Sequence, residues 1–148
     1  MIALVCDHGG FDLMKVVREY LETSGLEFKD FGTFTTDYCD YPTVAAPAAN
    51  AVASGVCDKG IFICGTGIGM SILANKTCGI RAALCTNRYM AEMSRNHNNA
   101  NVLVLGGRVV DSDTAIEMVK GFLSTAFSDK EKHHRRVKML EDLDIARK

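Results

Sequence analysis

A cysteine followed by a glycine-rich turn is the feature of this sequence that most directly suggests chemistry. Cys64 ends an apolar run and precedes Gly65-Thr66-Gly67-Ile68-Gly69. Glycine amides at the start of a helix can bind an anion or a developing oxyanion, and they also favour a thiolate. The segment therefore predicts either a proton-transferring cysteine beside an oxyanion site, or a tight strand-to-helix turn next to a small buried thiol.

This turn differs from three familiar phosphate-binding motifs. In a dinucleotide-binding fingerprint the last glycine would stand where the chain has Met70, and the turn would follow the first strand. A P-loop needs Gly-Lys-Ser/Thr, which is missing here. A thiol phosphatase would need an arginine at position 70. The cysteine is thus a candidate base rather than a phosphatase nucleophile.

Two histidines, an aspartate and an asparagine stand at other predicted element ends. Asp7 and His8 follow the first apolar run, and His97 with Asn98 ends a segment of helical periodicity. Taken singly, Asp7 fits a helix cap, His8 a loop hydrogen bond, and His97 a favourable place in a helix dipole. Ligands of open parallel sheets bind at the carboxyl ends of the strands. We therefore expect these side chains to meet Cys64 at one edge of the sheet.

Several basic side chains could hold a phosphate group. Arg108 follows the last apolar run, and Lys132, Arg135 and Arg136 lie in the charged C-terminal segment. A guanidinium can grip two phosphate oxygens at once. A solvated basic helix face would have the same composition, so both interpretations stay open for the C-terminal segment.

Short apolar runs alternate with helix-period segments along the chain. Strands are expected at 2–6, 27–31, 61–64, 80–85 and 102–105, and a polar loop at 32–42. Helices are expected at 13–21, at 44–54, up to 76, from 87 to 97 and at 116–126. This alternation predicts an α/β fold of three layers, with a five-stranded parallel sheet in which 61–64 is central. The charged segment 127–148 predicts a C-terminal helical extension against a neighbour or a partner chain.

Composition and charge exclude several classes of protein. Seventeen basic and eighteen acidic side chains give a net charge of -1, so nucleic acid and anionic membranes are not attracted overall. No apolar run approaches the roughly 20 residues that cross a bilayer, and the run 2–6 is too short for a targeting segment. We expect a cytoplasmic protein with neither partner, and the length of 148 residues predicts a single domain over 1–148.

The six cysteines form neither a metal-binding nor a disulfide pattern. No Cys-x-x-Cys pair occurs, which argues against a zinc knuckle or a thioredoxin motif. Cys57 with Cys64, and Cys78 with Cys85, flank predicted strands, where seven extended residues span about 23 Å and cannot be bridged. We expect reduced thiols, with Cys6, Cys57, Cys78 and Cys85 acting as small buried hydrophobes.

Several segments, in order along nearly the whole chain, resemble the ribose-5-phosphate isomerase type B family, which includes the galactose-6-phosphate isomerase subunits. They are Asp7-His8-Gly9-Gly10, Asp40-Tyr41-Pro42, Ile63-Cys64-Gly65-Thr66-Gly67-Ile68-Gly69, Ala74-Asn75-Lys76, Gly79-Ile80-Arg81-Ala82, Ser94-Arg95-Asn96-His97-Asn98 and Gly107-Arg108-Val109-Val110. The Cys-Gly-Thr-Gly and His-Asn motifs are the most specific of them.

The resemblance implies an aldose-ketose isomerase that interconverts ribose 5-phosphate and ribulose 5-phosphate on a Rossmann-like fold, with no metal or organic cofactor. Cys64 would move the proton between C1 and C2, Thr66 and the glycine amides would hold the enediolate oxygen, and His97 would assist ring opening. The substrate-binding positions would be Asp7, His8, Tyr41, Gly65, Gly67, Gly69, Asn98, Arg108, Lys132 and Arg136. Of these, Asp7 and Asn98 would bind sugar hydroxyls, and His8, Arg108 and Arg136 the phosphate.

The resemblance also implies a homodimer, or a tetramer built from it, whose active sites are shared between chains. His97, Asn98 and Arg108 would then come from the partner chain. One departure concerns the phosphate: the family usually has Gly-Gly-Arg-His where this chain has Lys130-Glu131-Lys132-His133. Lys132 thus replaces an expected arginine.

Two other functions remain compatible with the sequence. One is an isomerase of a six-carbon sugar phosphate, such as allose or galactose 6-phosphate. The other is a non-catalytic flavodoxin-like binding module or regulatory subunit that keeps the fold and the pocket.

Overall fold

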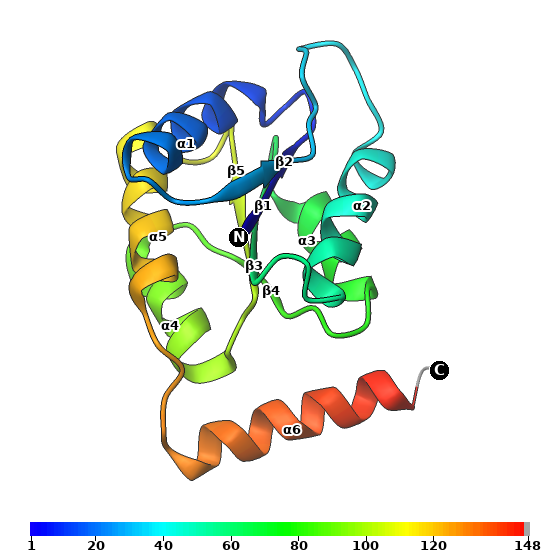
Figure 1. Ribbon diagram of the computed structural model, residues 1–148, viewed down its shortest axis with the longest axis vertical. Coiled ribbons are helices and arrows are strands. Elements are labelled where there is room, and N and C mark those ends of the chain that lie inside the picture. Colours follow the sequence, from blue (N-terminus) through cyan, green and yellow to red (C-terminus); the bar gives the residue numbers. More distant parts are fainter. Residues whose placement is uncertain (147–148) are drawn as a thin grey trace.

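The computed structural model describes residues 1–146, and five parallel strands form its central sheet (Figure 1). The strands are β1 (Ile2–Cys6), β2 (Phe28–Asp30), β3 (Lys59–Cys64), β4 (Ala82–Leu84) and β5 (Val102–Gly106). They lie in the order β2-β1-β3-β5-β4, so β3 is the central strand. The predicted five-stranded parallel sheet is confirmed, including the position of its third strand.

The three inner strands are enclosed on both faces. Every residue of β1 and β5 is buried, and so is every residue of β3 after Lys59. Such strands consist of continuous apolar runs, and for this reason their positions could be predicted well from the sequence. The edge strands β2 and β4 are shorter than predicted, with three residues each. At β4 the amide of Arg81 donates to Oδ1 of Asn101 (2.8 Å), and the paired register begins only at Ala82.

Helices form a layer on each face of the sheet. They are α1 (Phe11–Thr23), α2 (Tyr41–Ala53), α3 (Ile68–Lys76), α4 (Arg88–Asn98), α5 (Ser112–Ser124) and α6 (Glu131–Ile145). Helices α1, α4 and α5 cover one face and α2 and α3 the other (Figure 1). One apolar core contains Leu4, Ile61 and Phe122, and the second contains Val5 and Phe62. Successive strand residues point to opposite faces, so each inner strand contributes to both cores, and the three-layer prediction is confirmed.

Helices α2 and α5 begin three and four residues earlier than the sequence pattern predicted. α2 starts at Tyr41 with Pro42 in its first turn, so the polar loop is shorter than expected. Proline suits this position because its fixed φ is helical and its missing N–H has no intrahelical partner there. α5 starts at Ser112, because the carboxylate of Asp111 accepts the N–H of Thr114 (2.7 Å) and caps the helix.

The strand order reverses between β1 and β3. From β1 the chain moves to β2 on one side and then crosses back to place β3 on the other side. At such a reversal the two following loops lead to helices on opposite faces and leave a crevice at the carboxyl ends of the strands. The loops after β1 and β3 carry Asp7, His8 and the glycine turn, so the topology itself brings these segments together.

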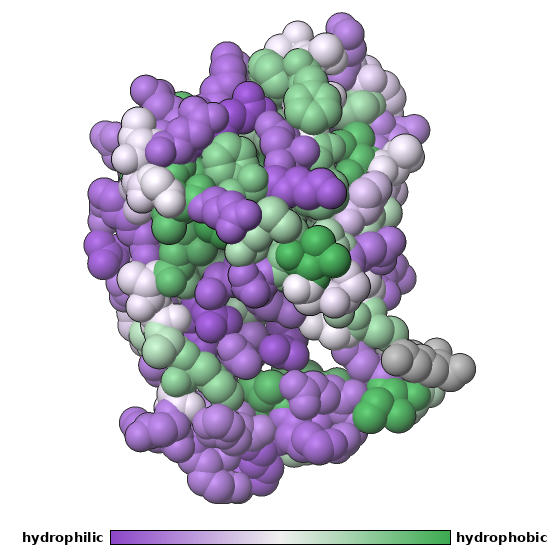
Figure 2. All heavy atoms as spheres, viewed as in Figure 1, coloured by the Kyte–Doolittle hydropathy of each residue, from purple (hydrophilic) through white to green (hydrophobic). Residues whose placement is uncertain are grey.

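Helix α6 is the predicted C-terminal extension. It lies across the end of the molecule where α4 finishes, beyond the linker after α5 (Figure 1). His133 and Val137 are its buried residues, whereas Leu140, Leu143 and Ile145 are exposed. Apolar side chains gather towards its C-terminal end in Figure 2. Within residues 1–146, no helix is both long enough and apolar enough to span a membrane.

Candidate functional site

The loops after β1 and β3 meet at the carboxyl edge of the sheet. We call the side chains gathered there, with the glycine turn, the sheet-edge site: Asp7, His8, Tyr41, Cys64, Thr66 and Arg108. Its two loops approach closely. A Cβ atom on Gly9 would lie 3.0 Å from the backbone nitrogen of Gly65, and one on Gly10 would lie 2.5 Å from the carbonyl oxygen of Ile63. Glycine at these positions lets the two main chains meet.

Cys64 ends β3 at the base of the glycine turn, and its side chain is 5% exposed. Gly67 adopts φ of +81°, a conformation that suits glycine, and turns its N–H towards the cysteine. That N–H donates to Sγ of Cys64 at 3.2 Å. Oγ1 of Thr66 accepts the N–H of Ile68 (3.2 Å) in the first turn of α3. An amide donor and a helix N-terminus thus both face the sulfur, an arrangement that stabilises negative charge.

Asp7 shapes the loop that faces the glycine turn. Its Oδ1 accepts the N–H groups of Gly9 (2.8 Å) and Gly10 (3.1 Å), and the residue is 7% exposed. Gly10 is the N-cap of α1 and has no side-chain cap, so Asp7 closes the preceding turn instead of capping the helix. Both hydrogen bonds use Oδ1, so Oδ2 of Asp7 can accept a hydrogen bond from a hydroxyl group.

His8 is held from the loop between β2 and α2. The backbone N–H of Cys39 donates to Nδ1 of His8 at 3.3 Å, and the ring of Tyr38 lies 5.0 Å away. When Nδ1 accepts, the proton of a neutral imidazole resides on Nε2. His8 is therefore prepared to donate a hydrogen bond from Nε2, as binding of an oxyanion requires.

Tyr41 and Arg108 frame the glycine turn. A Cβ on Gly69 would lie 2.8 Å from the Tyr41 ring, so the ring packs directly on the first turn of α3. The N–H of Arg108 donates to the carbonyl of Gly65 (2.9 Å), and a Cβ on Gly65 would lie 3.1 Å from Nη1 of Arg108. This corrects the expectation that Arg108 reaches the site from a partner chain, because the loop after β5 lies beside the loop after β3.

The other cysteines are free thiols in several environments. Burial raises the pKa of Cys6 to about 12 and that of Cys85 to about 11, so both stay protonated at neutral pH. Cys57 is buried too. Cys78 was expected to be buried but is partly exposed, because it follows α3 in a surface turn where its thiol faces the carbonyl of Asp144 (3.9 Å).

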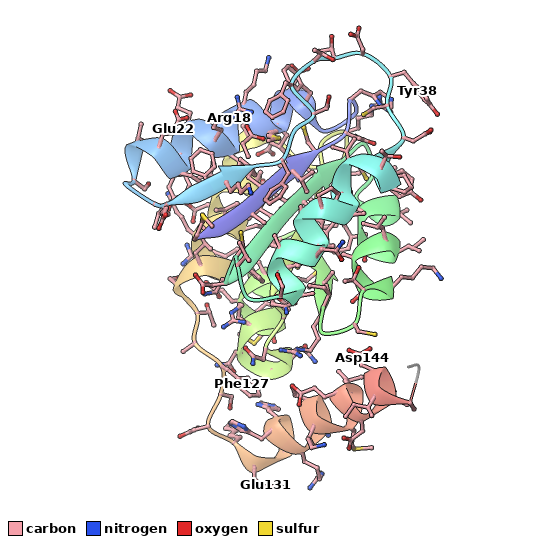
Figure 3. All side chains as sticks on the ribbon, turned by 45° about the vertical axis from the view of Figure 1, so that its right-hand side comes forward. Arg18, Glu22, Tyr38, Phe127, Glu131 and Asp144 are labelled. Carbon is pink, nitrogen blue, oxygen red and sulfur yellow. The ribbon has the colours of Figure 1, made fainter. Side chains whose placement is uncertain are left out.

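His97 and Asn98 do not join Cys64 at the carboxyl edge, and the expectation of one shared edge is wrong within a single chain. Helix α4 runs back antiparallel to the strands, so its last turn leads into the start of β5. The register pairs Gly60 with Val102 and Cys64 with Gly106, and four steps of about 3.3 Å separate the two edges by roughly 13 Å. The loop tip at Tyr38 and the start of α6 at Glu131 mark opposite ends of the molecule in Figure 3.

His97 and Asn98 belong instead to a second group, the α4–α6 cluster, with Lys132, His133 and Arg136. The ring of His97 lies 4.5 Å from that of His133. The charges of Lys132 and Arg136 act on His133 from the same helix. Apart from the buried His133, all members of the cluster are exposed. The cluster therefore presents cations and hydrogen-bonding groups to solvent.

Sequence reasoning missed His133 as a site residue. Its neighbours Lys132 and Arg136 were identified from their charge and from the family resemblance. The available signal was the four-residue spacing of His133 and Val137, which are the two buried residues of α6. The partner they bury against, the end of α4, could not be identified from this spacing.

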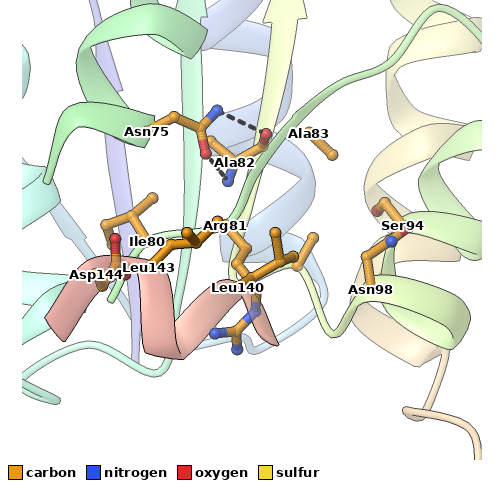
Figure 4. Close-up of a pocket in the computed structure, with 11 residues that line it drawn as sticks. Asn75, Ile80, Arg81, Ala82, Ala83, Ser94, Asn98, Leu140, Leu143 and Asp144 are labelled. Carbon is orange, nitrogen blue, oxygen red and sulfur yellow. Dashed lines mark hydrogen bonds between the residues drawn. The ribbon is translucent and has the colours of Figure 1, made fainter. Parts of the chain in front are cut away.

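A cavity of about 340 Å³ separates α6 from the body of the protein (Figure 4). Leu140, Leu143 and Asp144 line it from α6, and Arg81 and Asn98 are among the residues on the opposite wall. The cavity is distinct from the sheet-edge site, because the two share no residue. Among residues 1–146, no group of three or more His, Cys, Asp or Glu side chains is arranged to hold a metal ion.

Comparisons with known proteins relate the chain to one enzyme family. Residues 2–140 match the Ribose/Galactose Isomerase family. The chain is 42% identical over 146 residues to "Ribose-5-phosphate isomerase B" of Escherichia coli K12, covering 99% of this chain and 97% of that protein. It is 41% identical over 127 residues to "D-erythrulose-4-phosphate isomerase" of Pectobacterium atrosepticum, covering 85% and 84%.

A solved structure of Clostridium thermocellum ribose-5-phosphate isomerase B has a similar fold. It superposes with a TM-score of 0.96 at 46% identity, covering 99% of each chain. Family match, sequence identity and fold therefore agree over nearly the full chain. The protein belongs to the ribose/galactose isomerase family of sugar-phosphate isomerases.

Proposed function

We propose that this isomerase interconverts D-ribose 5-phosphate and D-ribulose 5-phosphate through an enediolate, with Cys64 as the base. The observation that carries the proposal is the Cys64 sulfur, which receives the N–H of Gly67 at the end of the central strand. The named activities of the relatives from Escherichia coli and Clostridium thermocellum support the five-carbon substrate. The family is one of isomerases, which argues against a non-catalytic flavodoxin-like module.

In the aldose-to-ketose direction the Cys64 thiolate takes the proton from C2 of the open-chain sugar. The electron pair of that C–H bond forms the C1–C2 double bond, and negative charge moves onto the carbonyl oxygen O1. Thr66 and the amides of the glycine turn stabilise this oxyanion. The thiol then returns its proton to C1 while the O2 hydroxyl proton moves to O1, which leaves a carbonyl at C2.

Binding groups on either side of Cys64 position the sugar. Asp7 accepts a sugar hydroxyl with its free carboxylate oxygen. His8 and Arg108 bind the phosphate, since an imidazole N–H and a guanidinium both donate to phosphate oxygens. Tyr41 packs over the turn and closes the site on the α2 side. The phosphate group does not react, so the energy gained when the protein binds it can be used to hold C1 and C2 of the sugar beside the thiolate.

The remaining groups come from a second copy of the chain in this proposal. Ring opening of the furanose needs His97, and Asn98, Lys132 and Arg136 bind hydroxyls and phosphate. In the same chain, however, these residues lie at the amino edge of the sheet or beyond it, and roughly 13 Å of strand separates that edge from Cys64. A homodimer in which the α4–α6 cluster of one chain faces the sheet-edge site of the other brings both halves together. The exposed apolar residues Leu140 and Leu143 on α6 are suited to such contacts.

Substrate length is the part of the proposal that the geometry constrains least. The similarity to a protein named for erythrulose 4-phosphate makes a four-carbon sugar phosphate a specific second candidate. Six-carbon allose and galactose 6-phosphates are the third. The six free cysteines fit a reducing compartment, and we propose a cytoplasmic location.

The test is a panel of tetrose, pentose and hexose phosphates compared by kcat/KM in the presence of a chelator. We expect ribose 5-phosphate to give the highest value and ketose formation to survive chelation. A value for a tetrose or hexose phosphate more than tenfold higher would assign the enzyme to that substrate. Failure to isomerise any member would contradict the proposal.

A further inference from the structure

His133 is the buried polar side chain of the α4–α6 cluster. It is 5% exposed, and its Nδ1 atom is enclosed without a hydrogen-bond partner within residues 1–146. An enclosed nitrogen without a partner is unfavourable, because the folded protein does not replace the hydrogen bond that water provides. A phenyl ring would fill the same space without this cost. We therefore expect Nδ1 of His133 to form a hydrogen bond when the protein functions.

The ring that lies against His133 is His97. The two ring centroids are 4.5 Å apart and the planes are tilted by 39°. The N–H of Ser128 donates to the carbonyl of Asn96 (2.9 Å), which ties the linker just before α6 to the last turns of α4. His97 is exposed and His133 is buried behind it. A rotation of the outer ring can present one of its nitrogens to Nδ1.

His133 is suited to accept a hydrogen bond because its environment keeps the ring neutral. Burial lowers its pKa, and the positive charges of Lys132, Lys130 and Arg136 and a charged His97 lower it further. A neutral imidazole with its proton on Nε2 has a lone pair on Nδ1.

We propose that His133 is the positioning residue for His97: Nδ1 of His133 accepts the N–H of His97 that faces away from the sugar. The opposite His97 nitrogen is then presented to the ring oxygen of the furanose in a fixed orientation and tautomer. A catalytic imidazole oriented by a buried third group is a recurrent arrangement in enzymes. The role rests on the proposed function, in which His97 opens the sugar ring.

Three substitutions of His133 separate this role from simple packing. His133→Phe keeps a ring but removes the acceptor. His133→Asn places an amide oxygen near the position of Nδ1, whereas His133→Gln places its amide near Nε2. We expect kcat for ribose 5-phosphate to fall about 10- to 100-fold in the Phe and Gln variants and to stay within about threefold of wild type in the Asn variant. His134→Gln is the matched control on the same helix, because its amide can still bond the carbonyl of Ser128.

A second measurement isolates ring opening from proton transfer. Ribulose 5-phosphate cannot form a furanose, because its C5 oxygen carries the phosphate. Exchange of its C1 hydrogen with deuterated solvent therefore reports the Cys64 step alone. We expect this exchange to stay near the wild-type rate in all His133 variants and in His97→Ala. Adding His133→Phe to His97→Ala should cause no further loss of aldose turnover, because His133 acts through His97.

A His133→Phe variant with wild-type aldose turnover would overturn the role and leave His133 as a packing residue. So would Asn and Gln variants that are equally impaired, or a loss of C1 exchange that parallels the loss of turnover. A wild-type enzyme that neither forms ketose nor exchanges the C1 hydrogen would overturn the proposed function, and this role with it. Thermal unfolding of each variant establishes that the compared proteins are folded.

Discussion

At the scale of single residues, the structure separates cysteines that differ little in sequence context. Cys6 and Cys64 both end inner strands, and both are buried. The Cys6 thiol faces the carbonyl oxygen of Thr33 (3.9 Å), whereas the Cys64 sulfur accepts the N–H of Gly67. Burial raises the pKa of Cys6 to about 12, so this thiol stays protonated near neutral pH. Cys64 differs in the backbone N–H that the glycine turn directs at its sulfur, and this contact marks it as the catalytic candidate.

Replacing Cys64 should abolish turnover without unfolding the protein. Cys64→Ala removes the base but leaves a small side chain in a well-packed strand, so we expect ligand binding to persist. Cys64→Ser should also be badly impaired, because a hydroxyl is a far weaker base near neutral pH. The measurements are kcat for ribose 5-phosphate and ligand-dependent thermal stabilisation, with Cys57→Ala as a buried-cysteine control. Near-normal kcat in Cys64→Ala would show that another group moves the proton.

Lys132 and Arg136 should contribute unequally to phosphate binding. An arginine presents a planar fork to two phosphate oxygens, whereas a lysine offers a point charge on a flexible stem. We expect Arg136→Ala to lower kcat/KM for ribose 5-phosphate roughly ten- to a hundredfold, and Lys132→Ala to have a smaller effect. The loss should be much smaller for unphosphorylated ribose.

Lys132→Arg tests the same assignment by restoring the planar guanidinium, and KM should stay the same or decrease. Arg135→Ala is the control, because that side chain is exposed and paired with Glu131 (3.3 Å). If the Lys132 and Arg135 variants behave alike, Lys132 is an ordinary solvated lysine.

At the scale of elements, the sequence predicted the inner strands and most of the sheet-edge site. Continuous apolar runs identify β1, β3 and β5, and a reversal of strand order places the loops of the first two together. The placement of His97 failed because the carboxyl-edge rule applies to strand ends, whereas His97 ends a helix that returns to the amino edge. His133 was missed because burial of a histidine in a charged helix depends on its packing partner, which periodicity does not reveal.

The buried thiol of Cys6, at the end of β1, should make the free energy of unfolding decrease at alkaline pH. The pKa of Cys6 is about 12 in the folded protein, against 9.0 for an exposed thiol. The unfolded chain then loses this proton at lower pH than the folded protein does. Its contribution to stability is complete below pH 9 and declines up to pH 12, by at most about 1.4 kcal/mol per pH unit.

The measurement is the free energy of unfolding in urea from pH 8 to 11, for wild type and Cys6→Ala. We expect the wild type to lose stability more steeply than the variant. Cys78→Ala is the control, because this partly exposed thiol should leave the slope unchanged. Equal slopes for wild type and Cys6→Ala would contradict the assigned thiol environment.

At the scale of the whole molecule, the proposed chemistry is divided between two ends. The sheet-edge site holds the base and the oxyanion donors, and the α4–α6 cluster holds the ring-opening histidine and further phosphate-binding cations. Helix α6 lies across the far end beside its own cavity, with apolar residues exposed along it (Figures 1 and 4). Two copies related by a twofold axis would place each cluster against the other chain's sheet-edge site and form two equivalent sites.

Mixing two inactive variants tests this division most directly. Each hybrid dimer of His97→Ala and Cys64→Ala chains holds one site with both an intact Cys64 and an intact His97. With equal amounts and free exchange, half of the dimers are hybrids, so about a quarter of wild-type activity should return. Subunit exchange is followed independently by native mass spectrometry of the mixture. Recovery near this level is the predicted result, and exchanged hybrids with no activity above the separate variants would contradict a site shared between chains.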